Sequence, residues 1–213
     1  MSQELKREFR ILPAPLIDLT LGAADHLARG LVRFGVDPNV LTVLGVLAGI
    51  AVGLFYGLGA PALAAGFIVI CGVFDILDGK VASNASRSSL FGAILDSSLD
   101  RYFEFFMYAG LAYHFRHGWG LWLTLLAILG SNMVSYTRAR AEGLGIVCRV
   151  GVMQRAERLV LLFLGTVVGI VFDVLDPALL TVMALVGVVS NITAAQRILY
   201  VKKCEKRQLS EEI

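Results

Sequence analysis

Long runs of apolar residues recur along the chain, separated by short segments rich in polar residues, glycine or proline. Six of these runs approach the roughly 20 residues that an α-helix needs to cross a bilayer. We therefore predict six membrane-spanning helices, the first of them capped by Asn39 or Thr42. The predicted spans run from about Asn39 to Gly57, from Pro61 to the first aspartate pair, from Leu90 to Phe115, from Trp119 to Arg138, from Val150 to Phe172 and from Ala178 to Tyr200.

The segment before the first span has a different pattern. Between Leu16 and Phe34 the apolar residues recur at helical spacing, and the charged residues lie largely off that stripe. This pattern predicts an amphipathic helix that lies on the membrane surface. A single all-α membrane domain over residues 1–213 is expected, with a lead and juxtamembrane helix over 1–37, a six-helix core over 38–201 and a charged tail over 202–213.

Composition agrees with a polytopic membrane protein. Hydrophobic residues make up 57% of the chain and charged residues 17%, against about 25% charged residues in soluble domains. The first ten residues, MSQELKREFR, are polar, so no cleaved signal peptide is predicted. The net charge of +2 gives no reason to expect a nucleic-acid partner, and three unpatterned cysteines predict neither a disulfide framework nor a thiolate metal site.

The basic residues predict the orientation. Lysine and arginine gather before the first span and after spans two, four and six, whereas the other loops hold only Arg116. Because cytoplasmic loops carry the excess of basic residues, both termini are expected in the cytoplasm and the protein in the cell (inner, plasma) membrane.

Four aspartates lie in the stretch DILDGKVASNASRSSLFGAILDSSLD. Asp75 and Asp78 are three residues apart, and Asp96 and Asp100 are four apart, so each pair would share one helix face. Ionised carboxylates beside apolar sequence are costly unless a cation compensates them. Hard oxygen ligands favour Mg²⁺, Mn²⁺ or Ca²⁺. The predicted topology puts all four at the cytoplasmic ends of spans two and three, which a nucleotide can reach.

The spacing D-x2-D-G-x2-A followed by G-x3-D-x3-D resembles the signature of the CDP-alcohol phosphatidyltransferases. In one departure, the family usually has arginine directly after the alanine, where this chain has Ser83. Lys80 or Arg87 could supply the phosphate or nucleotide contact instead. The matching positions are Asp75, Asp78, Gly79, Ala82, Gly92, Asp96 and Asp100.

This resemblance implies an enzyme that transfers a phosphatidyl group from a CDP-lipid to an alcohol and releases CMP. It further implies two bound metal ions, Mg²⁺ or Mn²⁺, and a homodimer among membrane lipids. Asp100 would also act as the base that takes the proton of the alcohol. The implied metal ligands are Asp75, Asp78, Asp96 and Asp100, and the implied CDP-lipid contacts are Asp78, Gly79, Ala82, Ser83, Arg87 and Gly92.

Arginines gather on the same predicted side, at the ends of spans four, five and six. Arginine is suited to bidentate binding of phosphate, although anchoring at anionic lipid headgroups would also place arginines there. These segments are similar to those of the inositol-phosphate branch of the family, the phosphatidylinositol phosphate and archaetidylinositol phosphate synthases. The resemblance implies that the phosphate of inositol 1-phosphate binds Arg138, either Arg155 or Arg158, and Arg197.

Several alternatives remain open at this stage. Within the enzyme class, glycerol 3-phosphate or serine could be the acceptor. A cation transporter could use the aspartates as an ion path, and Ser83 leaves room for a lipid-binding protein that has lost catalysis. Arg101 and Glu104 could form an ion pair with each other or orient the carboxylates of the site.

Overall fold

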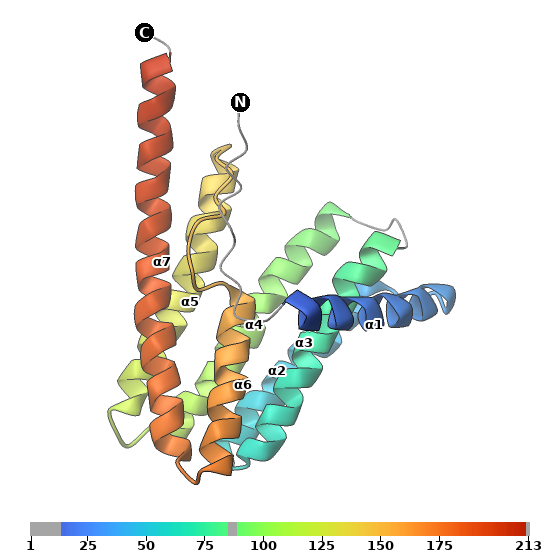
Figure 1. Ribbon diagram of the computed structural model, residues 1–213, viewed down its shortest axis with the longest axis vertical. Helices are drawn as coiled ribbons and strands as arrows, with labels where there is room; N and C mark the ends of the chain where they lie inside the picture. The colour runs from blue at the N-terminus through green and yellow to red at the C-terminus, as the bar shows by residue number, and fades with distance from the viewer. Residues whose placement is uncertain (1–13, 85–88, 212–213) are drawn as a thin grey trace.

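The computed structural model describes residues 14–84 and 89–211, which form seven α-helices and, within these ranges, no β-strand. Helices α2 to α7 run up and down through one bundle, and α1 lies across their direction (Figure 1). The expectation of an all-α fold is confirmed. The helices are α1 (Ala14–Arg33), α2 (Pro38–Gly57), α3 (Pro61–Asn84), α4 (Leu90–His114), α5 (Gly120–Gly143), α6 (Arg155–Val171) and α7 (Leu175–Glu211).

Helix α1 is the amphipathic helix predicted over residues 16–34. It buries Ala24 and Ala28 in a small apolar cluster that also includes Leu77 and Val81 of α3. Burial of these small side chains lets α1 approach the end of α3 closely. Helix α1 therefore packs against the C-terminal part of α3, which carries Asp78.

Several helix boundaries differ from the prediction. The N-cap of α2 is Asp37, whose carboxylate accepts a hydrogen bond from the backbone N–H of Asn39 at 2.8 Å. Helix α3 continues past the first aspartate pair, the predicted end of the second span, as far as Asn84. Helix α7 continues beyond Tyr200, the predicted end of the sixth span, and through the charged tail to Glu211.

The segment between α5 and α6 also differs. Helix α5 runs to Gly143, beyond the predicted end at Arg138, and α6 begins at Arg155 rather than near Val150. The backbone has positive φ at Gly145 (80°) and Gly151 (115°). Because these conformations do not belong to an α-helix, residues 144–154 form a connecting segment.

Each helix of the bundle packs against particular neighbours. Helix α4 packs chiefly against α2 and α5, whereas α6 packs against α7 and α3. The backbones of α2 and α4 approach most closely at two glycines, since a Cβ added to Gly110 would overlap the backbone of Gly53. Small residues permit such close approach between membrane helices.

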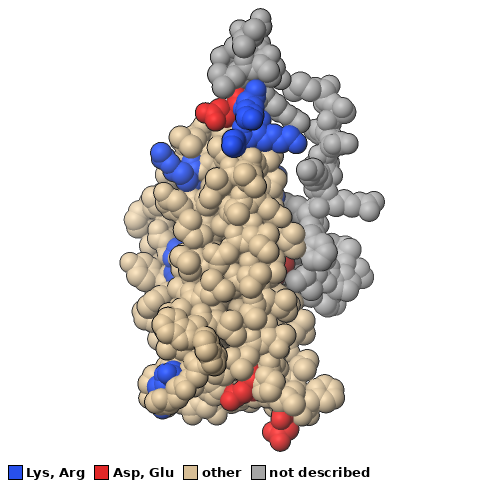
Figure 2. Space-filling view, turned by 90° about the vertical axis from the view of Figure 1, so that its left-hand side faces the viewer, with Lys and Arg blue, Asp and Glu red and all other residues tan. Residues whose placement is uncertain are grey.

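Within the part of the chain that the structure describes, four helices are long and apolar enough to cross a membrane: α2, α3, α5 and the part of α7 up to Lys206. Helix α4 carries four charged residues between Asp96 and Glu104, and α6 has 17 residues. On the face seen in Figure 2, charged side chains gather near the two ends and leave a broad middle band almost without them. These features are those of a helical membrane protein.

Candidate active site

The ends of α3 and α4 bring three of the four predicted aspartates together. One carboxylate oxygen each from Asp75, Asp96 and Asp100 lies within 4.8 Å of the others. Asp75 comes from the second half of α3, and the other two come from the first three turns of α4. Three convergent carboxylates are a hard oxygen donor set, so they fit a divalent cation of the Mg²⁺ or Mn²⁺ type.

Asp78 also lies on α3, but its side chain points toward α2. The hydroxyl of Thr42 on α2 donates a hydrogen bond to Asp78 Oδ2 at 2.9 Å, and both side chains are buried. This contact fixes one oxygen of the carboxylate toward α2. Asp78 therefore borders the group of three aspartates, and its role as a metal ligand stays a prediction.

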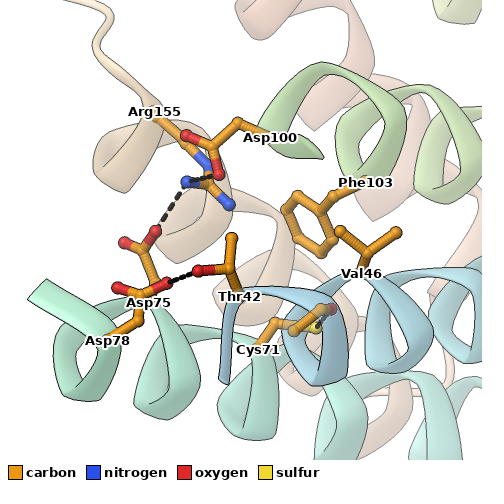
Figure 3. A pocket seen from close by; sticks show the side chains of 9 residues that line it. Thr42, Val46, Cys71, Asp75, Asp78, Asp100, Phe103 and Arg155 are labelled. Carbon is orange, nitrogen blue, oxygen red and sulfur yellow. Dashed lines mark hydrogen bonds and ion pairs between the residues drawn. The ribbon is translucent and has the colours of Figure 1, made fainter. Parts of the chain in front are cut away.

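Arg155, in the first turn of α6, enters the centre of the site. Its Nη1 atom donates to Asp75 Oδ1 at 2.6 Å and also forms an ion pair with Asp100 Oδ1 (Figure 3). The guanidinium lies 5.0 Å from the ring centroid of Phe103, in a cation–π contact. An arginine among three carboxylates offsets part of their mutual repulsion.

A small pocket joins these groups (Figure 3). The carboxylates and Arg155 form its polar side, and apolar side chains from α2, α3 and α4 form the other. A single pocket thus contacts four different helices. Its lining consists of Thr42, Gly45, Val46, Cys71, Asp75, Asp78, Asp100, Phe103 and Arg155.

The predicted CDP-lipid contacts lie on the last two turns of α3 and at the start of α4. Gly79 and Ser83 are exposed, and a Cβ added to Gly79 would meet nothing within 4 Å. Ala82 is half-buried beside them. Gly92 has a local role, since its N–H donates to the N-cap hydroxyl of Ser89 at 2.9 Å. Arg87 lies outside the described residues.

Lys80 follows Gly79 on α3 and is half-buried. A hydrogen bond from Asn84, together with the charges of Arg29 and Lys80, lowers the pKa of the Asp25 carboxyl. The role of Lys80 as a substitute for the arginine missing at Ser83 stays a prediction.

The four predicted phosphate-binding arginines occupy different environments. Arg138 is exposed and donates to Glu142 at 2.9 Å. Arg197 is buried, and its guanidinium donates to the carbonyls of Val150, at 2.9 Å, and Val134. Arg158 is buried deeper along α6. Among the described residues, Arg155 is the one of the four that forms an ion pair with a motif aspartate.

Two contacts of the site do not follow from the sequence. The sequence pattern predicts Thr42 only as a helix cap, although it lies one turn into α2 and its hydroxyl reaches Asp78 on α3. Glu104 pairs with Arg158 and not with Arg101, whose guanidinium instead lies 3.6 Å from Asp100 Oδ2. No signal in the sequence distinguishes between these partners.

Comparison with known proteins agrees with this geometry. The family model for CDP-alcohol phosphatidyltransferase matches residues 36–193, which include all four motif aspartates. Over 172 residues the chain is 36% identical to the archaetidylinositol phosphate synthase of Methanothermobacter thermautotrophicus, covering 79% of this chain and 85% of that protein. Over 178 residues it is 35% identical to the phosphatidylinositol phosphate synthase of Mycobacterium tuberculosis, covering 81% and 82%.

Solved structures of the M. tuberculosis enzyme are similar in fold. The structure with CDP-DAG bound has a TM-score of 0.76 at 34% identity, covering 84% of this chain and 92% of that one. The structure in complex with manganese and citrate has a TM-score of 0.75 at 34% identity, covering 84% and 88%. With the motif, the convergent aspartates and the matched residues in agreement, this chain belongs to the CDP-alcohol phosphatidyltransferase family.

Proposed function

We propose that this enzyme transfers a phosphatidyl group from a CDP-lipid, either CDP-diacylglycerol or an archaeal-type analogue, to inositol 1-phosphate and releases CMP. The convergence of Asp75, Asp96 and Asp100 beside Arg155 carries this proposal. It places acids that can hold cations next to a guanidinium that can hold a phosphate. The acceptor assignment is further supported by relatives named as inositol phosphate synthases.

Two divalent ions, Mg²⁺ or Mn²⁺, would be held by Asp75, Asp78, Asp96 and Asp100. When bound, such ions neutralise the pyrophosphate and the charge that develops during phosphoryl transfer. In our mechanism a carboxylate oxygen of Asp100 takes the proton of the acceptor hydroxyl. That hydroxyl oxygen bonds to the phosphorus of the phosphatidyl group as the bond to the bridging oxygen breaks, and CMP leaves with that oxygen.

The basic residues are proposed to hold the acceptor. Arg155 faces the aspartates, so it can contact a phosphate brought next to them. Arg197, with Arg138, stays a candidate for the same phosphate, whereas Arg158 is buried and paired with Glu104. Gly79, Ala82, Ser83 and Gly92 are proposed to border the CDP moiety, because they lie on the helix ends next to the acids.

The membrane arrangement is part of the proposal. Helices α2 to α7 would form six spans, with both termini and the site on the cytoplasmic side, as the basic residues of the loops indicate. A homodimer in the plasma membrane is proposed from the family resemblance. The transporter and lipid-binding alternatives lose support because the matched family consists of transferases.

The test is a CMP-release assay with purified protein, CDP-diacylglycerol and Mg²⁺. Inositol 1-phosphate, inositol, glycerol 3-phosphate and serine are supplied one at a time. We expect release with inositol 1-phosphate to exceed release with the others by at least about tenfold. Stronger release with glycerol 3-phosphate or serine would overturn the acceptor assignment, and no release with any alcohol would overturn the transfer itself.

A further inference from the structure

A second ion pair lies one helical turn below the site. Arg158 on α6 donates from both Nε, at 3.1 Å, and Nη2 to the same oxygen of Glu104 on α4. The side chains of Arg158 and Glu104 are 1% and 2% exposed, respectively. A buried charge pair of this kind carries a large desolvation penalty, so hydrophobic packing would stabilise the bundle as well or better. Its presence therefore calls for a role other than stability.

Two ion pairs, Asp100 with Arg155 and Glu104 with Arg158, connect α4 to α6 at successive turns. These helices run in the same direction through the bundle (Figure 1). Asp100 and Glu104 are four residues apart on α4, about 6 Å along the axis, while Arg155 and Arg158 are three apart on α6, about 4.5 Å. The inner pair, Glu104 with Arg158, thus sits directly beneath the outer pair, Asp100 with Arg155.

Backbone packing does little to fix α4 against α6. Helix α4 packs chiefly on α2 and α5, and α6 on α7 and α3, so long side chains make the link between them. Arg158 also donates from Nη1 to the carbonyl of Met153, in the segment that precedes α6. The N–H of Met153 in turn donates to Thr193 Oγ1 on α7, at 3.3 Å. Arg158 thereby ties the start of α6, where Arg155 lies, to Glu104.

We propose that Glu104 and Arg158 are positioning residues, which hold the start of α6 so that Arg155 stays between Asp75 and Asp100. This inference rests on the proposed function only in taking those aspartates as the cation ligands. Arg155 and a divalent cation compete for the same carboxylate oxygens. A loosened Arg155 should therefore give tighter cation binding together with slower turnover, a combination that simple damage to the fold does not produce.

The probe is Mn²⁺ alone, titrated into the purified full-length protein in detergent, with free Mn²⁺ followed by electron paramagnetic resonance. The test variant is the apolar double replacement Glu104→Met/Arg158→Met, which leaves no buried charge unpaired and should keep the fold. We expect the Kd of this double variant for Mn²⁺ to fall about fivefold, and its CMP release to slow by about tenfold. Arg155→Gln alone should also lower the Kd for Mn²⁺. In the Arg155→Gln background the same double replacement should change the Kd by less than about twofold, because its effect acts through Arg155.

Tyr56→Phe is the matched control. The Tyr56 hydroxyl hydrogen-bonds to Thr166 and ties a deeper turn of α6 to α2. Losing this buried contact should lower the melting temperature and leave the Kd for Mn²⁺ unchanged. If the double variant does not fold, Glu104→Gln takes its place, since it removes the charge and keeps an acceptor for Arg158.

The proposal is overturned if the folded variant binds Mn²⁺ as the wild type does. It is also overturned if the double replacement weakens Mn²⁺ binding. The same holds if the double replacement still lowers the Kd for Mn²⁺ about fivefold in the Arg155→Gln background. Because Mn²⁺ binding is measured without substrates, a failure of the proposed acceptor in the CMP-release assay leaves this test intact.

Discussion

Arg155 and Asp75 are 80 positions apart in the sequence, yet Nη1 of the arginine lies 2.6 Å from Oδ1 of the aspartate. The contact joins the first turn of α6 to the second half of α3 at the centre of the aspartate cluster (Figure 3). It places the basic group expected to receive an acceptor phosphate beside the acids expected to hold the metal.

Replacing Asp100 with asparagine should remove the base and little of the binding surface. We expect Asp100→Asn to lower turnover by about 10²-fold or more, with CDP-lipid binding largely retained. CMP release and equilibrium binding of the CDP-lipid measure the two effects. Asp173→Asn is the matched control, because Asp173 lies in the α6–α7 connection with φ of 54°, a conformation that asparagine accepts. Near-normal turnover in Asp100→Asn would remove the base assignment.

Arg197→Ala tests the acceptor phosphate. The replacement removes a candidate phosphate contact and leaves the carbonyls of Val150 and Val134 without their donor. We expect a KM for inositol 1-phosphate raised about tenfold and a stability loss of about 1–3 kcal/mol. Arg140→Ala, at an exposed arginine of α5, should change neither. A lower melting temperature with an unchanged KM would show that Arg197 only secures the segment before α6.

Ser83→Arg restores the residue usual in the resembling family. Because Ser83 is exposed on the last turn of α3, an arginine fits there without displacing other side chains. The variant should keep its activity or show a lower KM for the CDP-lipid, and Ser83→Ala should resemble the wild type. A drop in turnover of about tenfold or more in Ser83→Arg would mean that this part of the site is built differently.

Gly110→Ala tests the close approach of α2 and α4. The added Cβ would overlap the backbone of Gly53, so the helices must separate, at a cost of about 1–3 kcal/mol. The melting temperature in detergent should fall accordingly. Gly66→Ala on α3 is the control, since a Cβ there meets nothing within 4 Å and alanine favours the helix. Equal melting temperatures for the two variants would contradict the close contact.

The helices and the aspartate pairs were predictable because both depend on local spacing. Apolar runs of sufficient length indicated each helix, and separations of three and four residues put the carboxylates on shared faces. The ends of α5 and α6 were missed because they depend on the backbone at Gly145 and Gly151, which can adopt either helical or left-handed conformations.

The contacts between helices could not be read from the sequence. Whether Glu104 pairs with Arg101, three residues before it, or with Arg158, on another helix, depends on how α4 and α6 are placed. The same holds for Thr42, whose hydroxyl reaches Asp78 only because α2 packs on α3. Such partners follow from tertiary packing, which local propensity does not determine.

The most direct test of the account is the location of Mn²⁺ in crystals of the active protein, by its anomalous scattering. We predict density at the group formed by Asp75, Asp96 and Asp100, and its loss in Asp96→Asn. Anomalous density elsewhere, or none at these carboxylates in protein that releases CMP, would contradict the central claim that the acids of α3 and α4 bind the catalytic metal.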